Sequence, residues 1–301
     1  MSKHYFLQDK VVLITGATGG IGAATARELY SRGANLVLTD LSEPTGVALA
    51  AEFDPTRVLP LVLDVTDAAA AKAVVEQVVA RFGRLDVVFA NAGISWRGAP
   101  SSMVGCDEDE FERIVEVDFL GVWRTVKAAL PQIVANQGQV VVTSSIYAFM
   151  NGMVNAPYAA SKAAVEMLAR ALRAELAGTG ATASVLYPGW IATPIAEVAF
   201  GGNALATQLV QTVFPAPLRA QITPDVVAAG VADGLAERRP RIVVPGRWAP
   251  LSLLRGLLAA ASDAYLDRNR KVQALVRRIE AESRPTEFTP ARRRSGPAPT
   301  T

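Results

Sequence analysis

The sequence predicts a single domain of the α/β class, built on a doubly wound parallel sheet of about seven strands with helices on both faces. Short apolar runs alternate with longer segments of helical periodicity from residue 10 to residue 245. Glycines or polar residues follow several of these runs, as they do where the strands of such a sheet end. Strands separated by helices of this length pair in parallel through right-handed crossovers. The 301 residues, half of them hydrophobic, suffice for one large core.

The first strand is predicted at residues 10–15, where a continuous apolar run meets a glycine cluster. That cluster opens a helix that continues to about Arg32, and Gly33 ends it. Further strands are predicted at residues 35–39, 58–63, 85–90, 139–143, 183–187 and 241–245. Further helices are predicted at residues 68–82, 107–134 (with Asp107 as its N-cap), 158–177 and 224–237.

The glycine cluster, Gly16 to Gly22, points to a nucleotide. Glycines let the backbone approach a pyrophosphate, and the free N–H groups at a helix start favour negative charge. The same cluster also fits a purely structural turn. Asp40 ends the second strand, 24 residues after Gly16, where a carboxylate can bind a ribose 2′-hydroxyl and would repel a 2′-phosphate. Since neither the loop nor Leu41 supplies an arginine, we expect NAD rather than NADP.

Tyr158 and Lys162 are four residues apart, so on a helix both side chains lie on one face. A lysine charge about 4 Å away is worth roughly 4 kcal/mol at an effective dielectric near 20, or about three pKa units. That lowers a phenol pKa of about 10 toward neutrality, the range that a general acid/base needs. Ser145, 13 residues before Tyr158, can hydrogen-bond a substrate oxygen beside the phenol. Taken alone, these residues also fit a helix surface pair and a turn serine.

Composition excludes several kinds of site and partner. One cysteine, Cys106, and one histidine, His4, rule out an internal disulfide and leave almost no material for a His/Cys metal site or a His-based triad. Residues 265–301 hold nine basic against four acidic residues, although the net charge is only +2, so the body is not a nucleic-acid surface. We see no secretory signal and no transmembrane stretch, and expect a cytoplasmic protein.

Six short motifs occur in sequence over roughly residues 8–247: Thr15-Gly16-x-x-x-Gly20-Ile21-Gly22, Asp64-Val65, Asn91-Ala92-Gly93, Ser145, Tyr158-x-x-x-Lys162 and Pro188-Gly189-x-x-x-Thr193. In order and spacing they resemble the short-chain dehydrogenase/reductase family, which has a Rossmann-type fold. The glycine loop can also be aligned through Gly19, as in the family's longer epimerase-like branch. Asn91-Ala92-Gly93 and the spacing from Ser145 to Tyr158 favour the shorter dehydrogenase branch.

The resemblance implies a role for each matching residue. Tyr158 is the general acid/base, Lys162 lowers its pKa and binds the nicotinamide ribose, and Ser145 holds the substrate oxygen. The implied cofactor-binding residues are Gly16, Thr18, Gly20, Ile21, Gly22, Asp40, Asp64, Val65, Asn91, Gly93, Tyr158, Lys162, Pro188, Gly189, Ile191 and Thr193.

One position departs from the family pattern. Asp118 stands where many relatives have an asparagine that helps to hold a water on a proton relay to the lysine. An ionised carboxylate close to Lys162 would stabilise the ammonium and oppose the phenolate. Asp118 is therefore a catalytic-site candidate, which either replaces the asparagine in its hydrogen bonding or alters the proton path.

The family places its substrate lid at residues 194–222, which are mostly apolar and small here, with Gly201-Gly202 as a hinge candidate. Such a pocket suits a lipophilic alcohol or ketone, and the same residues suit a core or a subunit interface equally well. The large apolar side chains predicted near this edge are Trp96, Phe149, Met150, Met153 and Trp190.

Three segments divide the chain. Residues 1–247 form the expected NAD(P)-binding domain, residues 248–281 a helical extension, and residues 282–301 a disordered basic tail that contains Arg292-Arg-Arg294. The extension, which begins with Trp248 and several leucines, fits a helix docked on the body or on a second subunit. Residues 248–301 also fit a peripheral contact with an anionic membrane.

Two functions follow. The first is an NAD-dependent dehydrogenase or reductase for a secondary alcohol or ketone, steroid- or lipid-like, with Tyr158 as the general acid/base. The second is a non-catalytic NAD(H)-binding regulator or scaffold on the same fold, motivated by Asp118 and the C-terminal extension. The family's habit implies a homodimer or homotetramer, and we expect no nucleic-acid partner.

Overall fold

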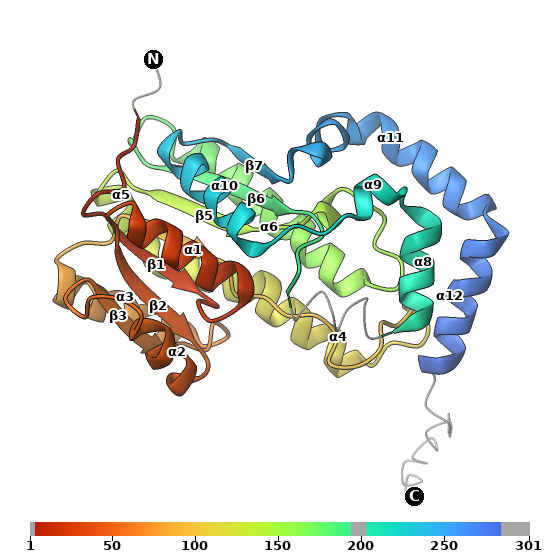
Figure 1. Ribbon diagram of the computed structural model, residues 1–301, viewed down its shortest axis with the longest axis horizontal. Coiled ribbons are helices and arrows are strands. Elements are labelled where there is room, and N and C mark those ends of the chain that lie inside the picture. The colour runs from red at the N-terminus through yellow and green to blue at the C-terminus, as the bar shows by residue number, and fades with distance from the viewer. Residues whose placement is uncertain (1–3, 194–202, 284–301) are drawn as a thin grey trace, which may run out of the picture.

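The computed structural model describes residues 4–193 and 203–283, and it confirms the predicted fold class. All neighbouring strands pair in parallel, in the order β3-β2-β1-β4-β5-β6-β7 (Figure 1). The strands are β1 (Val11–Thr15), β2 (Asn35–Asp40), β3 (Val58–Val62), β4 (Val87–Ala90), β5 (Gln139–Thr143), β6 (Thr182–Pro188) and β7 (Arg241–Val244).

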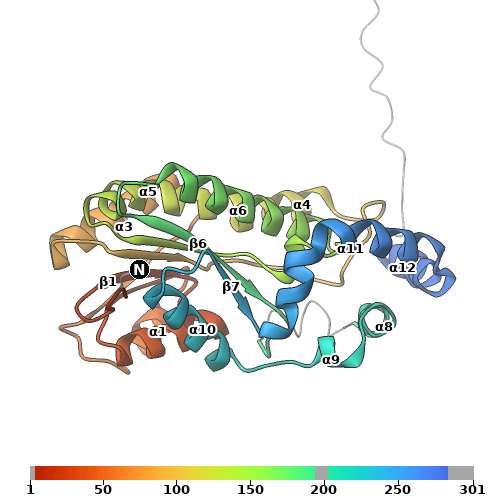
Figure 2. The same ribbon diagram turned by 90° about the horizontal axis from the view of Figure 1, so that it is seen from above.

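Helices cover both faces of the sheet, as Figure 2 shows from above. On one face lie α1 (Gly20–Ser31), α2 (Glu43–Ala50) and α10 (Pro224–Ala236). On the other side lie α3 (Ala68–Phe82), α4 (Glu108–Val115), α5 (Val122–Ala135) and α6 (Ala156–Glu175). The sequence did not predict α2, a short helix with Pro44 and Gly46 among its eight residues.

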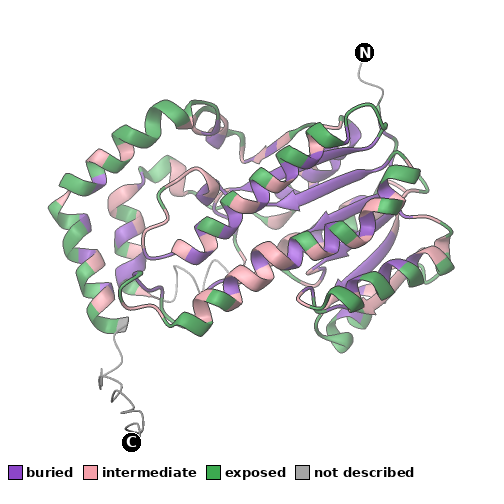
Figure 3. Cartoon of the chain, turned by 180° about the vertical axis from the view of Figure 1, so that it is seen from behind, coloured by how far each residue is buried: buried purple, intermediate pink, exposed green. Residues whose placement is uncertain are grey.

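The first strand shows why its run is apolar without interruption. Val11 and Leu13 pack into the cluster formed with α3, α5 and α6, whereas Val12 and Ile14 pack into the cluster formed with α1 and α10. A parallel strand with helices on both faces buries every side chain, so apolar and polar residues do not alternate along it. Figure 3 shows the strands as the most deeply buried part of the chain.

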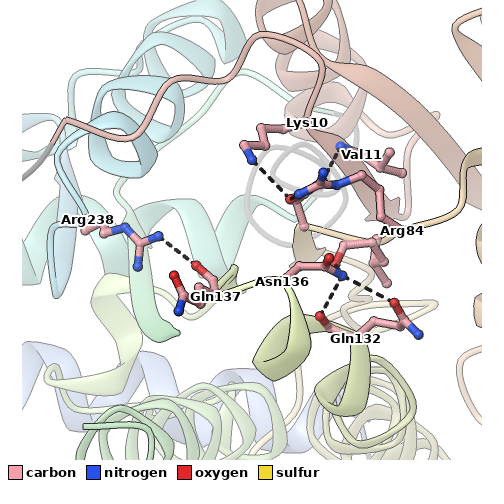
Figure 4. Close-up of polar contacts among 9 residues, drawn as sticks. Lys10, Val11, Arg84, Gln132, Asn136, Gln137 and Arg238 are labelled. Atoms are coloured by element: carbon pink, nitrogen blue, oxygen red, sulfur yellow. Dashed lines mark hydrogen bonds and ion pairs between the residues drawn. The ribbon is translucent and has the colours of Figure 1, made fainter. Parts of the chain in front are cut away.

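The amino-terminal ends of the strands are tied together by polar contacts (Figure 4). Asp86, just before β4, is fully buried and accepts hydrogen bonds from Arg84 Nη2 at 2.6 Å and from the Val11 N–H at 3.0 Å. Arg238, before β7, donates to the carbonyl of Gln137, before β5, at 2.7 Å. These contacts hold the amino-terminal edge of the sheet together. The loops at the carboxyl edge form the cavity described below.

The helix predicted over residues 107–134 is observed with one local change. Asp107 caps it by accepting a hydrogen bond from the Glu110 N–H at 2.9 Å, as expected. Between α4 and α5 the helix continues through a π-helical segment, η1 (Glu116–Gly121). A π-helical turn holds one residue more than an α-helical turn, so it changes which side chains face inward. Asp118, within this segment, is fully buried.

The C-terminal part contains α8 (Ala204–Val213) and α9 (Ala216–Arg219), both within the predicted lid, followed by α11 (Ala249–Arg268) and α12 (Arg270–Ser283). Helix α12 packs on α8 through buried Val272, Leu275 and Ile279. Of the predicted lid, residues 194–202 lie outside the described residues, and so does the Gly201-Gly202 hinge candidate. Residues 284–301 of the predicted tail also lie outside them.

Candidate active site

A cavity of about 760 Å³ opens at the carboxyl edge of the sheet, where β1, β4, β5 and β6 end side by side. This is the edge at which doubly wound sheets bind their ligands. Two of the predicted site residues, Gly22 and Asp118, do not line the cavity. The predicted residues that do line it are Gly16, Thr18, Gly20, Ile21, Asp40, Asp64, Val65, Asn91, Gly93, Ser145, Tyr158, Lys162, Pro188, Gly189, Ile191 and Thr193.

The glycine loop has no space for side chains. Gly16 has φ +61°, and a Cβ there would lie 2.9 Å from the Ala92 Cα. A Cβ on Gly20 would lie 2.8 Å from Cγ2 of Thr193, and one on Gly22 would lie 2.2 Å from the Gly16 carbonyl oxygen. Gly22 thus lets α1 begin against the loop, behind the cavity. The bare backbone at the start of α1 fits a pyrophosphate.

Asp40 is held at the end of β2 in a defined orientation. Its Oδ2 accepts hydrogen bonds from the Thr18 hydroxyl at 2.6 Å and from the Thr18 N–H at 3.0 Å, and its Oδ1 accepts one from the Leu41 N–H at 2.8 Å. Oδ1, which accepts one hydrogen bond, has a further lone pair for a ribose hydroxyl. Among the described residues, three cationic residues line the cavity: Arg97, Arg113 and Lys162. None of them belongs to the glycine loop or to β2, the strand that ends in Asp40.

Asn91 lines the cavity and also hydrogen-bonds the loops around it. Its Nδ2 donates to the carbonyl oxygens of Thr15 at 3.2 Å and Gly16 at 3.3 Å, and its Oδ1 accepts from the Thr143 hydroxyl at 3.1 Å. One side chain therefore links the ends of β1, β4 and β5. The structure thus adds a positioning contact to the cofactor-wall role implied for Asn91.

Ser145, Tyr158 and Lys162 come together at the other part of the cavity. Ser145 lies between β5 and the short helix η2 (Ile146–Ala148), while Tyr158 and Lys162 occupy the first turns of α6. The Ser145 hydroxyl is close enough to the Tyr158 phenol to lower the pKa of that phenol. The Lys162 Nζ lies 5.3 Å from the centre of the Tyr158 ring. The two elements thus place a hydroxyl, a phenol and an ammonium around one point of the cavity.

The pKa of Tyr158 differs from the sequence-based expectation. Burial raises it, the Lys162 charge lowers it, the Asp118 charge raises it and the hydrogen bond with Ser145 lowers it, with a pKa above the ordinary value as the result. The argument from the lysine charge alone was therefore wrong about the net direction, because it left out desolvation. In the protein without cofactor the phenol is protonated at neutral pH.

This direction can be measured. In an ultraviolet difference titration of the cofactor-free protein against its Tyr158→Phe variant, the tyrosinate signal assigned to Tyr158 should have its midpoint above 10.0. The physical reason is that burial destabilises the phenolate more than the lysine charge stabilises it. A midpoint below 10.0 would show that the lysine charge outweighs burial.

Asp118 lies behind Lys162 and pairs with it. The Lys162 Nζ is 3.1 Å from Oδ2 of Asp118, and Oδ1 accepts a hydrogen bond from the Ile94 N–H at 2.7 Å. Burial lowers the pKa of Lys162, but the charges of Asp118 and Tyr158 and the hydrogen bond to Asp118 raise it above the ordinary value. Asp118 was predicted as a catalytic-site candidate, and the structure places it outside the cavity, where it positions Lys162.

The predicted apolar pocket is only partly found. Of its five large side chains, Trp190 alone lines the cavity. Trp96 is buried elsewhere, and the other three pack in apolar clusters, so for these four the core interpretation holds: Trp96, Phe149, Met150 and Met153. Lining residues that the sequence did not single out include Ile146, Tyr147, Asn155, Ser95, Arg97 and Arg113.

Within residues 4–193 and 203–283, no three His, Cys, Asp or Glu side chains gather in an arrangement that could hold a metal ion. Over the same residues, no helix combines the length and the apolar character needed to cross a bilayer.

Comparisons with known proteins show the family of the chain. Momilactone A synthase from Oryza sativa subsp. japonica is 36% identical over 206 residues, which are 68% of this chain and 74% of that protein. A short chain dehydrogenase/reductase from Burkholderia phymatum in complex with NAD superposes with a TM-score of 0.72 at 26% identity, covering 88% of this chain and 97% of that one. An alcohol dehydrogenase from Thermococcus sibiricus complexed with 5-hydroxy-NADP gives a TM-score of 0.66 at 29% identity, covering 79% and 96%. Residues 10–202 match the family model for short chain dehydrogenases, and the chain therefore belongs to the short-chain dehydrogenase/reductase family of oxidoreductases.

Proposed function

We propose that the protein is an NAD-dependent dehydrogenase or reductase that interconverts a secondary alcohol and a ketone. The observation that carries the proposal is the arrangement of one cavity. Ser145, Tyr158 and Lys162 line it together with the bare backbone of the glycine loop and the Asp40 carboxylate. A proton-transfer group and a dinucleotide cradle thus share one space, which is what the reaction requires.

Each of the three side chains has a part in the proton transfer. In reduction the Tyr158 phenol gives its proton to the carbonyl oxygen, and in oxidation the phenolate form of Tyr158 takes the proton from the alcohol hydroxyl. Ser145, which lines the cavity beside the phenol, holds the same substrate oxygen. Lys162, kept charged by Asp118, stabilises the phenolate. Bound NAD supplies the hydride acceptor for the alcohol carbon.

The remaining lining residues hold the cofactor in this proposal. Gly16, Gly20 and Ile21 surround the pyrophosphate, and Asp40 binds the adenosine ribose with Thr18 fixing its carboxylate. Behind them, Gly22 lets helix α1 start close to the loop. The other proposed contacts are Asp64 and Val65 to the adenine, Asn91 and Gly93 to the neighbouring wall, and Pro188, Gly189, Ile191 and Thr193 to the nicotinamide side.

The Asp40 carboxylate supports NAD over NADP, because it would meet a 2′-phosphate as a like charge. In paired assays we expect kcat/KM with NAD to exceed that with NADP by at least about a hundredfold, equivalent to about 3 kcal/mol. Asp40→Asn should narrow this ratio at least about tenfold, since it removes the charge and keeps an oxygen that can accept from Thr18. A wild-type preference for NADP, or a ratio unchanged in the variant, would contradict the assignment.

The substrate that fits is lipophilic. Beside Tyr158 the cavity is lined by Ile146, Tyr147 and Trp190. The Tyr147 ring lies edge-on to the Tyr158 ring, at a centroid distance of 6.0 Å, and to the Trp190 ring, at 6.1 Å. Apolar walls with few polar groups favour a hydrophobic alcohol or ketone over a sugar. The assays should therefore include cyclic and steroid-like secondary alcohols. Binding of NADH without turnover of any of them would favour the non-catalytic alternative.

A further inference from the structure

Helix α11 carries an apolar surface that the rest of the described chain leaves uncovered. Four leucines form it, Leu253, Leu254, Leu257 and Leu258, and we call them the α11 leucines. Leu253 is 73% exposed and Leu257 80% exposed. Figure 3 shows α11 at the rim of the molecule, with most of its residues exposed. Large apolar groups gathered in this way mark an interaction surface.

The helix is held firmly in this orientation. Arg255 is the one charged residue from position 249 to position 262, and its Nη1 and Nη2 bond the carboxylate of Glu166 on α6 at 2.7 and 2.5 Å. At the start of α11, Trp248 is fully buried, so Trp248 itself takes no part in the membrane contact that was one alternative for residues 248–301. A Cβ on Gly189 would lie 2.6 Å from the Trp248 Nε1. Both anchors leave the leucines facing outward.

The distribution of charge favours an anionic bilayer over a second copy of the chain as the partner of this surface. Residues 249–301 hold ten Lys and Arg against five Asp and Glu, whereas residues 1–248 hold twenty against twenty-three. On the described part of α12, the exposed basic residues are Arg270, Lys271, Arg277 and Arg278. A second copy would carry the same basic residues on α12, so it offers them no complementary charge. A negatively charged bilayer surface attracts the same segment.

We propose that the α11 leucines dock the protein on a lipid bilayer that contains anionic headgroups. Since no described helix is long and apolar enough to cross a bilayer, α11 lies in the plane of the interface. The leucines enter the boundary between headgroups and acyl chains, and the exposed basic residues of α12 contact the headgroups. Neither the leucines nor the basic residues of α12 line the active-site cavity, so docking does not depend on the proposed function.

The test is co-sedimentation of the full chain with vesicles of phosphatidylcholine, with and without phosphatidylserine. We expect binding to the mixed vesicles, weakened when salt rises from about 0.1 M to about 1 M. The L253Q/L257Q variant should bind at least about tenfold more weakly, because it removes two buried apolar side chains from the docked state. R277Q/R278Q should reduce binding to the mixed vesicles at least about tenfold and leave any binding to pure phosphatidylcholine unchanged.

A matched control removes exposed apolar groups elsewhere. Met103 and Val104 are 60% and 70% exposed on a loop outside the cavity, so M103Q/V104Q should change vesicle binding less than about twofold. The proposal is overturned if the wild-type chain does not sediment with the mixed vesicles, or if L253Q/L257Q binds them as the wild type does. It is equally overturned if L253Q/L257Q changes only the oligomeric state in sedimentation velocity, since the leucines would then contact a second copy.

Discussion

Tyr158→Phe is expected to lower kcat for secondary-alcohol oxidation by at least about a hundredfold, and by up to about 10⁴-fold, with little change in NADH affinity. The variant keeps the aromatic ring and its edge-on contact with Tyr147, and it removes the hydroxyl that exchanges the proton. Steady-state rates measure the first effect, and NADH fluorescence titration measures the second. A loss of affinity equal to the loss of rate would indicate a binding role for the phenol.

A tyrosine far from the cavity provides the control for this variant. Tyr30 on α1 accepts a hydrogen bond from the Asp54 N–H at 3.2 Å and does not line the cavity. Tyr30→Phe makes the same chemical change and should keep kcat within about twofold of the wild type. Turnover of the Tyr158→Phe variant at the wild-type rate would remove Tyr158 from the proposed mechanism.

Lys162→Met should lower both the stability of the protein and its turnover rate. It leaves the fully buried Asp118 without its counter-charge, and removing one partner of a buried ion pair costs about 3–5 kcal/mol of unfolding free energy. It also removes the positive charge that lowers the Tyr158 pKa, so turnover should fall at least about a hundredfold. Urea unfolding and steady-state kinetics on the same preparations measure the two losses.

The double variant Lys162→Met/Asp118→Asn separates these losses. Asparagine can still accept a hydrogen bond from the Ile94 N–H, and no buried charge remains, so stability should return to within about 1–2 kcal/mol of the wild type. Activity should not return, because the ammonium is still missing. A double-mutant cycle on the exposed Arg27–Glu52 pair should give a coupling energy of at most about 1 kcal/mol. The corresponding cycle on Lys162 and Asp118 should give a larger coupling energy. Equal coupling energies for the two pairs would contradict the inferred cost of leaving the buried Asp118 carboxylate unpaired.

The sheet and the contents of the cavity could be predicted from the sequence because their signals are local. Each strand is a continuous apolar run, and the residues just after a strand must lie at its carboxyl end. Gly16, Asn91 and Ser145 were placed at one edge in this way, and the cavity brings them together.

The properties that could not be predicted depend on contacts between distant segments. Asp118 is buried within the π-helical segment. The apolar pattern of the surrounding residues did not predict that segment. The net pKa direction of Tyr158 depends on desolvation, which is a property of the closed site. Trp248 fits a membrane-facing residue by sequence, and only its packing against Gly189 shows that it is buried.

The most direct test of the account follows the transferred hydrogen. The protein is incubated with NAD and a hydrophobic secondary alcohol that carries deuterium on the carbinol carbon, and the reduced cofactor is analysed by mass spectrometry. The account predicts that deuterium appears in the cofactor in step with ketone formation, and that the Tyr158→Phe variant forms neither at a comparable rate. A wild-type protein that binds the cofactor and transfers no deuterium from any alcohol of the panel would contradict it.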